Sequence, residues 1–193
     1  REVVLLTDGR FDETADREAP YARKVIRKRR TPDVTALELR RRKLTRVGFA
    51  ENQMSVAEFR ALGTLAKPVR LVPGSSPLSM LRAVKTSAEI RVAIDIAQRA
   101  FQRMQAWLRP GRTERQIAAR LAYEMQSLGA EGESFPAIVA AGATSSLPHY
   151  QPQDRPFEPN QPLLIDWGAR VGWYVSDLTR VLWVGSLPPR LRK

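Results

Sequence analysis

Cysteine is absent from this sequence of 193 residues, and histidine occurs only once, at His149. Without cysteine there are no disulfide bonds, no zinc sites built from thiolates and no thiol nucleophile. This composition is typical of cytoplasmic proteins, and we expect a cytoplasmic location. No apolar run approaches the roughly 20 residues that a membrane-spanning helix needs. The first residues also lack the basic start and apolar stretch of a secretory signal.

Acidic residues are few compared with basic ones, and the imbalance lies in one segment. The net charge is +12, and residues 21–46 carry +9 of it, with eleven Lys or Arg and two acids. Such a segment binds phosphates by releasing counterions. No aromatic residues are interleaved with the charges after Tyr21, however, as they would be in a surface that stacks bases. We expect a solvated face, or one that pairs with acidic residues elsewhere, and nucleic acid binding that is non-specific if it occurs at all.

The first part of the sequence alternates short β-rich runs with helical patterns. Strands are predicted in the opening residues up to the turn signal Asp8-Gly9, at residues 45–49 and at residues 67–72. Ser55 and Glu58 have the spacing of a capping box, which predicts a short helix. The run PGSSP at residues 73–77 then interrupts the pattern. We therefore predict a small α/β domain at residues 1–76 and a second domain at residues 77–193.

The second domain begins with the patterns of two amphipathic helices. The first is predicted from the capping box of Thr86 and Glu89 to Pro110, and the second from the capping box at residues 113–116 to Gly129. The apolar stripe of the first helix consists of Ile90, Ile94, Ala97, Phe101, Met104 and Leu108, and that of the second consists of Ile117, Leu121 and Met125. Buried strands are predicted at residues 135–141, 162–170 and 173–184.

Two aspartates, Asp166 and Asp177, interrupt the apolar run LIDWGARVGWYVSDLTRVLWV, residues 164–184, and we expect both to be buried. If Val171-Gly172 forms a two-residue hairpin turn, Arg170 pairs with Trp173 and Asp166 lies directly opposite Asp177. The two Cβ atoms would then be about 5 Å apart on one face of the sheet. A turn or bulge with an additional residue would shift this register.

Two buried carboxylates at this distance would not both remain ionised without compensation. The pair would share a proton, pair with a cation of the protein, or bind a divalent metal with oxygen ligands. Dyads that share a proton lie on glycine-rich loops rather than on facing strands, and Arg180 alternates to the other face of the strand from Asp177. The remaining alternative is that one aspartate is exposed at a sheet edge.

Several motifs occur in the order seen in one enzyme family. They are LLTDGRFDETADREAP and RVGFAENQMSVAEF in the first part, and then LRAVKTSAEI, LRPGRTERQIA, SFPAIVAAGATSSLPHYQP, LLIDWGAR and GWYVSDLTRVLWVG. The sequence resembles the pita-bread metallopeptidases, most closely the Xaa-Pro aminopeptidases and prolidases, to which creatinase is related. The resemblance implies an α+β fold. Part of a creatinase-type amino-terminal α/β domain is followed by the first half of a pita-bread domain, in which two helices pack on a curved antiparallel sheet.

The resemblance also implies roles for individual residues. Asp166 matches a ligand of one of two divalent ions, and Asp177 matches the ligand that bridges both. His149 matches a histidine that is not a ligand but contacts the substrate and supports the charged tetrahedral intermediate. Thr179 lies two residues after Asp177, points the same way along the strand and is expected to support the ligands.

The implied activity is hydrolysis of the amino-terminal Xaa-Pro peptide bond by a hydroxide that bridges two metal ions. Manganese is the expected metal, and cobalt and zinc are the alternatives. The implied partners are a peptide with proline in second position and, in the complete enzyme, further copies of the chain. The remaining histidine and two glutamate ligands of the family have no counterpart here. We therefore expect a chain that is truncated at both ends and inactive by itself.

A different class of function is kept as the alternative. Pita-bread domains also occur as non-catalytic pseudoenzymes, for instance in histone chaperones of the FACT type. The chain would then be a binding module for histones or nucleic acid, with the basic segment as a contact for nucleic acid. A continuation of the reading frame with a histidine and two glutamates would favour the peptidase.

Overall fold

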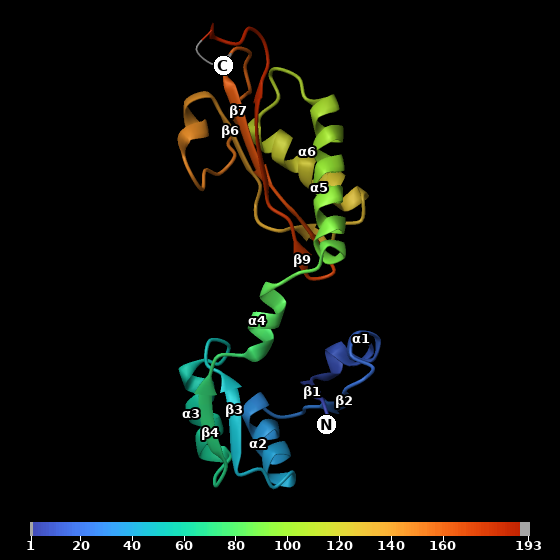
Figure 1. Cartoon of the computed structure of the whole chain (residues 1–193), viewed down its shortest axis with the longest axis vertical. Coiled ribbons are helices and arrows are strands. Elements are labelled where there is room, and N and C mark those ends of the chain that lie inside the picture. Colours follow the sequence, from blue (N-terminus) through green and yellow to red (C-terminus); the bar gives the residue numbers. More distant parts are fainter. Residues whose placement is uncertain (1, 190–193) are drawn as a thin grey trace. The chain divides into compact units, whose positions relative to one another are not determined.

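A computed structural model describes residues 2–189, which divide into two compact units on either side of the bond between Val84 and Lys85 (Figure 1). The domain boundary that the sequence predicts after Ser76 lies at the start of helix α4 (Pro77–Ala83), and it stays a prediction. Within the described part of the chain, no helix combines the length and the apolar character that crossing a membrane requires.

The first unit alternates strands and helices. Its elements are β1 (Val4–Thr7), the 3₁₀ turn η1 (Gly9–Phe11), α1 (Asp12–Glu18), β2 (Arg23–Ile26), α2 (Thr31–Arg41), β3 (Arg46–Ala50), α3 (Val56–Leu65), β4 (Arg70–Gly74) and α4. β1 pairs with β2 and β3 pairs with β4, both in parallel. The capping box of Ser55 and Glu58 opens α3 as predicted. The sequence pattern does not predict α2, because α2 buries only Ala36 and therefore lacks an apolar stripe.

The basic segment makes ion pairs within the first unit. Its paired cations include Arg23 and Arg42, which both reach Glu2 and Glu38, Arg27, which reaches Asp8, and Arg30, which reaches Asp33. These contacts agree with a face that pairs with acidic residues. Exposed pairs of this kind contribute little to stability, and they offset part of the positive charge of the segment.

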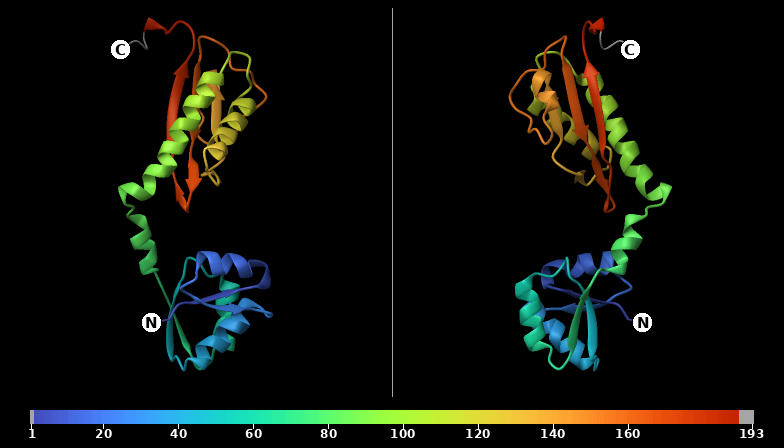
Figure 2. Two further views of the ribbon diagram at one scale, coloured as in Figure 1. Left: turned by 90° about the vertical axis from the view of Figure 1, so that its right-hand side faces the viewer. Right: turned by 60° about the vertical axis from the view of Figure 1, so that its left-hand side comes forward.

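The second unit packs two helices against one face of an antiparallel sheet (Figure 2). Its elements are α5 (Ser87–Trp107), α6 (Glu114–Ser127), β5 (Gly132–Glu133), β6 (Ile138–Ala141), the 3₁₀ turn η2 (Gly142–Ser146), β7 (Pro162–Trp167), β8 (Ala169–Val171), β9 (Tyr174–Val175) and β10 (Leu178–Trp183). One sheet has the order β10-β7-β6, and a smaller one has the order β5-β8-β9. Both helices begin with the predicted capping boxes.

The core of the second unit lies between these helices and the sheet. On α6 the predicted stripe of Ile117, Leu121 and Met125 is fully buried. The predicted stripe on α5 is only partly right: Ala97, Met104 and Leu108 are buried, but Ile90 is exposed, and Ile94 and Phe101 are half-buried. The buried face of α5 contains Ile96 and the small residues Ala93 and Ala100 instead, and the two alanines allow close packing of the helix.

The hairpin between β8 and β9 has a different turn from the predicted one. Gly172 and Trp173 form the turn, with φ of +54° and +71°, and Arg170 pairs with Val175. Further along the same register, Asp166 pairs with Thr179. The predicted pairs of Arg170 with Trp173 and of Asp166 with Asp177 are therefore wrong. The register differs by two residues, so each side chain keeps its face.

Trp173→Gly is expected to raise the free energy of unfolding. The Trp173 side chain is 80% exposed and contributes little packing, whereas its left-handed backbone is unfavourable for any residue with a Cβ. Trp173→Ala is the matched control, because it removes the ring but keeps the Cβ. In urea unfolding the glycine variant should exceed the alanine variant by about 1 kcal/mol. Equal stability of the two variants would contradict this account of the turn.

Candidate functional site

β7 places alternate side chains on the two faces of the sheet. Leu163, Ile165 and Trp167 are buried against the helices. Trp167 stacks on Phe101 and donates its indole N–H to the Ala97 carbonyl oxygen of α5 at 3.0 Å. Because alternation is strict along a strand, this anchoring directs Asp166 to the face away from the helices. The loop that follows β6 lies on that side of the sheet (Figure 1).

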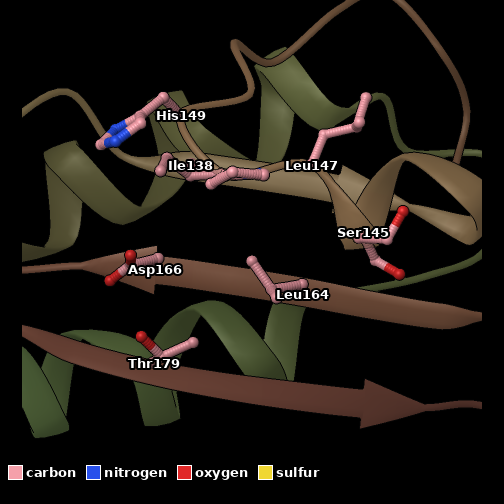
Figure 3. Close-up of a pocket in the computed structure, with 9 residues that line it drawn as sticks. Ile138, Ser145, Leu147, His149, Leu164, Asp166 and Thr179 are labelled. Carbon is pink, nitrogen blue, oxygen red and sulfur yellow. The ribbon is translucent and has the colours of Figure 1, made fainter.

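A pocket of about 290 Å³ lies on this face, near the lower end of the size range of small-ligand sites. Its lining residues are Ile138, Ser145, Ser146, Leu147, Pro148, His149, Leu164, Asp166 and Thr179. His149, Asp166 and Thr179 gather at one end, and Leu147, Ser145 and Leu164 lie towards the other (Figure 3). The polar side chains of three residues thus converge at one end of the pocket, whereas two leucines and Ser145 lie towards the other.

The two aspartates differ in exposure, which corrects the expectation that both are buried. Asp166 is half-buried in the middle strand β7, whereas Asp177 is exposed between β9 and β10, at the edge of the sheet. Burial raises the pKa of the Asp166 carboxyl, the hydroxyl of Thr179 works against this rise, and the charge of Asp177 adds to it. Asp177 thus lies where the alternative interpretation of the sequence places one of the two aspartates, exposed at a sheet edge.

The side chain of Asp177 lies on the same face as Asp166. Ser176, the preceding residue, is buried, and its hydroxyl donates to the Ala93 carbonyl oxygen of α5 at 3.1 Å. Successive side chains of an extended segment point to opposite faces, so Asp177 points away from α5. Asp166 and Asp177 are thus diagonal neighbours rather than direct partners, a relation that places residues about 7–8 Å apart in a regular sheet.

The donor chemistry of this pair fits a divalent cation. The Oδ1 atom of Asp166 is buried and accepts no hydrogen bond, and neither aspartate forms an ion pair with a described residue. Carboxylate oxygens are the ligands that manganese and magnesium prefer. Among residues 2–189, however, no three His, Cys, Asp or Glu side chains are grouped so as to hold a metal. The two aspartates fit part of a coordination shell, not the whole of one.

Asp166→Asn is expected to stabilise the metal-free chain, because it removes a half-buried carboxylate whose Oδ1 has no partner. Unfolding in EDTA at pH 7 should show a gain of about 1 kcal/mol. A carboxyl with a raised pKa contributes its stability at low pH and loses it as the pH rises. The gain should therefore shrink as the pH falls towards about 4. Asp95→Asn, at an exposed aspartate of α5, is the control, and an equal gain there would contradict the explanation.

The loop after β6 brings His149 to this pocket. The backbone of His149 has φ of +57°, and its side chain is exposed. In Figure 3 its ring lies at the same end of the pocket as Asp166. The structure thus places three of the residues that the sequence singles out, His149, Asp166 and Thr179, around one pocket. Their chemical roles stay predictions.

Three residues that position Asp177 are missed by the sequence analysis. Ser176 accepts a hydrogen bond from the Ala169 N–H at 3.0 Å and donates its own N–H to the Ala169 carbonyl at 2.9 Å. Ser134 donates its hydroxyl to the Ser176 carbonyl oxygen at 2.8 Å. Gly168 lies beside both serines. The one signal for this cluster in the sequence is a glycine within a predicted strand, which often marks a close approach of two backbones.

Comparison with known families matches residues 88–193 to metallopeptidase family M24. A Bacillus subtilis protein described as an uncharacterized peptidase, YqhT, is 34% identical over 153 residues, which are 78% of this chain and 43% of that protein. The Xaa-Pro dipeptidase of Pyrococcus furiosus is 38% identical over 109 residues, which are 55% of this chain and 31% of that protein. The chain thus spans less than half the length of these relatives.

Solved structures show the same similarity. The X-Pro aminopeptidase from Thermotoga maritima MSB8 matches 98% of this chain and 55% of its own, with a TM-score of 0.89 and 31% identity. The prolidase from Pyrococcus furiosus matches 99% of this chain and 56% of its own, with a TM-score of 0.82 and 28% identity. These matches confirm the predicted α+β fold class, a creatinase-type α/β part followed by two helices on an antiparallel sheet.

Proposed function

Because the chain belongs to metallopeptidase family M24, we propose that it contributes to an aminopeptidase that hydrolyses the bond between an amino-terminal residue and a following proline. The names of an X-Pro aminopeptidase and an Xaa-Pro dipeptidase among its relatives support this substrate class. The chain spans about half of such proteins, so the activity is proposed for an assembly that also supplies the other half. Residues 1–76 are proposed as part of a creatinase-like amino-terminal domain and residues 77–193 as the first half of a pita-bread catalytic domain.

The observation that carries the proposal is the buried Oδ1 of Asp166, which has no hydrogen-bond partner and lies close to a second carboxylate. In the proposed site Asp166 and Asp177 hold divalent ions, with manganese as the first candidate. Such ions supply a water of lowered pKa and polarise the carbonyl of the scissile bond. Thr179, on the neighbouring strand β10, is paired directly with Asp166 and is proposed to support its carboxylate.

His149 is proposed to donate an imidazole N–H to the carbonyl oxygen of the scissile bond as this oxygen gains negative charge. Its position at the polar end of the pocket, opposite the apolar Leu147 and Leu164, supports this role. Leu147 and Leu164 would contact an apolar side chain of the peptide. A hydrogen bond that strengthens only as charge develops acts on kcat rather than on KM.

A chimera tests the proposal, with this chain in place of the matching 55% of the Thermotoga maritima enzyme. Supplied with Mn²⁺, it should cleave Xaa-Pro peptides and leave peptides without proline in second position largely intact. His149→Ala should lower kcat by roughly 10²–10³-fold and leave the metal content unchanged. Leu147→Ala, in the same loop at the other end of the pocket, is the control and should change KM more than kcat.

Two results would contradict these assignments. A folded, metal-loaded chimera that hydrolyses peptides with and without proline equally well would refute the substrate class. A loss of bound metal in His149→Ala, in proportion to the loss of turnover, would make His149 a metal ligand rather than a donor to the substrate. Metal content by elemental mass spectrometry and steady-state kinetics on the same samples separate these results.

A further inference from the structure

Glu114 is a fully buried acid for which the proposed reaction has no use. It is the first residue of α6, and its exposed fraction is 0%. Among the described residues it forms no ion pair. Instead its carboxylate accepts three hydrogen bonds, from the Ala141 N–H at 2.8 Å, the Tyr150 hydroxyl at 2.9 Å and the Gln153 N–H at 2.9 Å. Burying a charge in this way is costly unless its hydrogen bonds are satisfied.

These three donors mark the two ends of the loop that carries His149. Ala141 is the last residue of β6, directly before the loop. Tyr150 and Gln153 lie on the segment that returns from it towards α6. The Arg115 N–H extends this contact by donating to the Gln153 carbonyl at 3.2 Å. Glu114 therefore ties the start of the loop to its return segment.

The part of the loop between these ends also makes hydrogen bonds of its own. In η2, the hydroxyls of Thr144, Ser145 and Ser146 each donate to the carbonyl three residues earlier, at 2.7–3.0 Å. His149 itself has a left-handed backbone, which is uncommon for a residue other than glycine and needs support from its surroundings. The support nearest to it in the chain is the hydrogen bond from Tyr150, the next residue, to Glu114.

We propose that Glu114 is a positioning residue, which holds the His149 ring at the pocket by tying Tyr150 and Gln153 to the end of β6. The catalytic consequence rests on the role of His149 under the proposed function, whereas the positioning itself does not. An ionised carboxylate is suited to this task because it accepts several hydrogen bonds and donates none. A glutamine would turn its NH₂ group towards at least one N–H donor.

A second buried glutamate on the same helix provides the matched control. Glu124 is 3% exposed and pairs with Arg103 and Arg120, and among the described residues none of its ion pairs involves the loop. Glu124→Gln therefore removes a buried charge from α6 and leaves the hydrogen bonds between Glu114 and the loop in place. A general weakening of the second unit would appear in both variants, and a loss of positioning only in Glu114→Gln.

The single histidine of the chain makes a direct test available, because all histidine ring signals in an NMR spectrum of the untagged chain come from His149. In Glu114→Gln the ring signal of His149 should move and broaden. Amide exchange of Ala141 and Gln153 should become about 10–100-fold faster. Tyr150→Phe, which loses one hydrogen bond and keeps the carboxylate, should move the His149 signal in the same direction by less. Glu124→Gln should leave it in place.

In the chimera, Glu114→Gln should lower kcat by about 10–100-fold, as loss of an orienting group does, with metal content unchanged and KM within about twofold. The proposal is overturned if His149 signals of folded Glu114→Gln or Tyr150→Phe coincide with those of the wild type, or if Glu124→Gln moves them equally. Displaced His149 signals with an unchanged kcat would refute the proposed role of His149 in the reaction and leave the positioning intact. Should Glu114→Gln not fold, Tyr150→Phe alone decides. If Glu114→Gln moves the His149 signals of the chain while the unsubstituted chimera cleaves no peptide, the proposed function is refuted and the positioning stands.

Discussion

Asp177→Asn is expected to remove specific Mn²⁺ binding from the chain and to lower the turnover of the chimera by about 10³-fold or more. Loss of an outer-shell group at a metal site costs about 10–100-fold, and loss of a direct ligand, the role proposed for Asp177, should cost more. Asparagine keeps the shape of the side chain and one oxygen, but it removes the negative charge. Since Asp177 is exposed, the substitution should leave the stability of the chain within about 0.5 kcal/mol.

Paramagnetic broadening by Mn²⁺ measures this binding in the chain itself. The amide signals of Asp166, Asp177 and Thr179 should broaden at the lowest Mn²⁺ concentrations, and this selectivity should disappear in Asp177→Asn. Asp95→Asn, at an exposed aspartate of α5, should broaden like the wild type. If Asp177→Asn retained both the metal stoichiometry and the turnover of the wild type, Asp177 would not be a ligand.

Structural features that depend on residues close together in the sequence could be predicted. The capping boxes at Ser55, Thr86 and Thr113 satisfy backbone donors three residues away, and all three form as predicted. The stripe of α6 is also right, because three large apolar residues fix its buried face. The stripe of α5 is displaced, because its apolar residues lie on more than one face: Ile96 is buried together with Ala93 and Ala100, whereas Ile90 is exposed.

The hairpin register depends on one backbone conformation that the sequence leaves ambiguous. A two-residue turn of this kind needs positive φ at both positions, and the sequence offers a single glycine, Gly172. Placing it second gives the predicted turn with Val171, and placing it first gives the observed turn with Trp173. A β-branched residue is the less suited of the two to positive φ, which favours the observed turn.

The surroundings of His149 could not be predicted, because they depend on contacts between distant parts of the chain. Glu114 and Tyr150 are 36 residues apart, and neither belongs to a repeating pattern. A buried glutamate at a helix start is indistinguishable in sequence from an exposed acid that favours the helix dipole. The aspartates were found because two charges in an apolar run are conspicuous, whereas the residues that position them are ordinary serines and a glycine.

That glycine separates the predicted strand 162–170 into β7 and β8. Gly168 accepts a hydrogen bond from the Ser134 N–H at 2.9 Å, and extension of the register from the neighbouring pairs places Gly168 opposite Asp177. A Cβ built on Gly168 would lie 1.8 Å from the Ser176 carbonyl oxygen and 2.2 Å from the Ser134 hydroxyl oxygen. The first of these atoms belongs to the backbone, directly before Asp177, and rotation of a side chain cannot relieve that contact.

Gly168→Ala should therefore destabilise the second unit by about 3 kcal/mol, the upper end for an overpacked site, and displace Asp177 as the Ser176 backbone moves. Urea unfolding measures the first effect and the loss of selective Mn²⁺ broadening the second. The same substitution at Gly63 of α3, where a Cβ meets no atom within 4 Å, should be neutral or stabilising. Ser134→Ala added to Gly168→Ala should restore little, because the Ser176 carbonyl remains in place. Full restoration would show instead that the Ser134 side chain, and not the backbone before Asp177, requires glycine here.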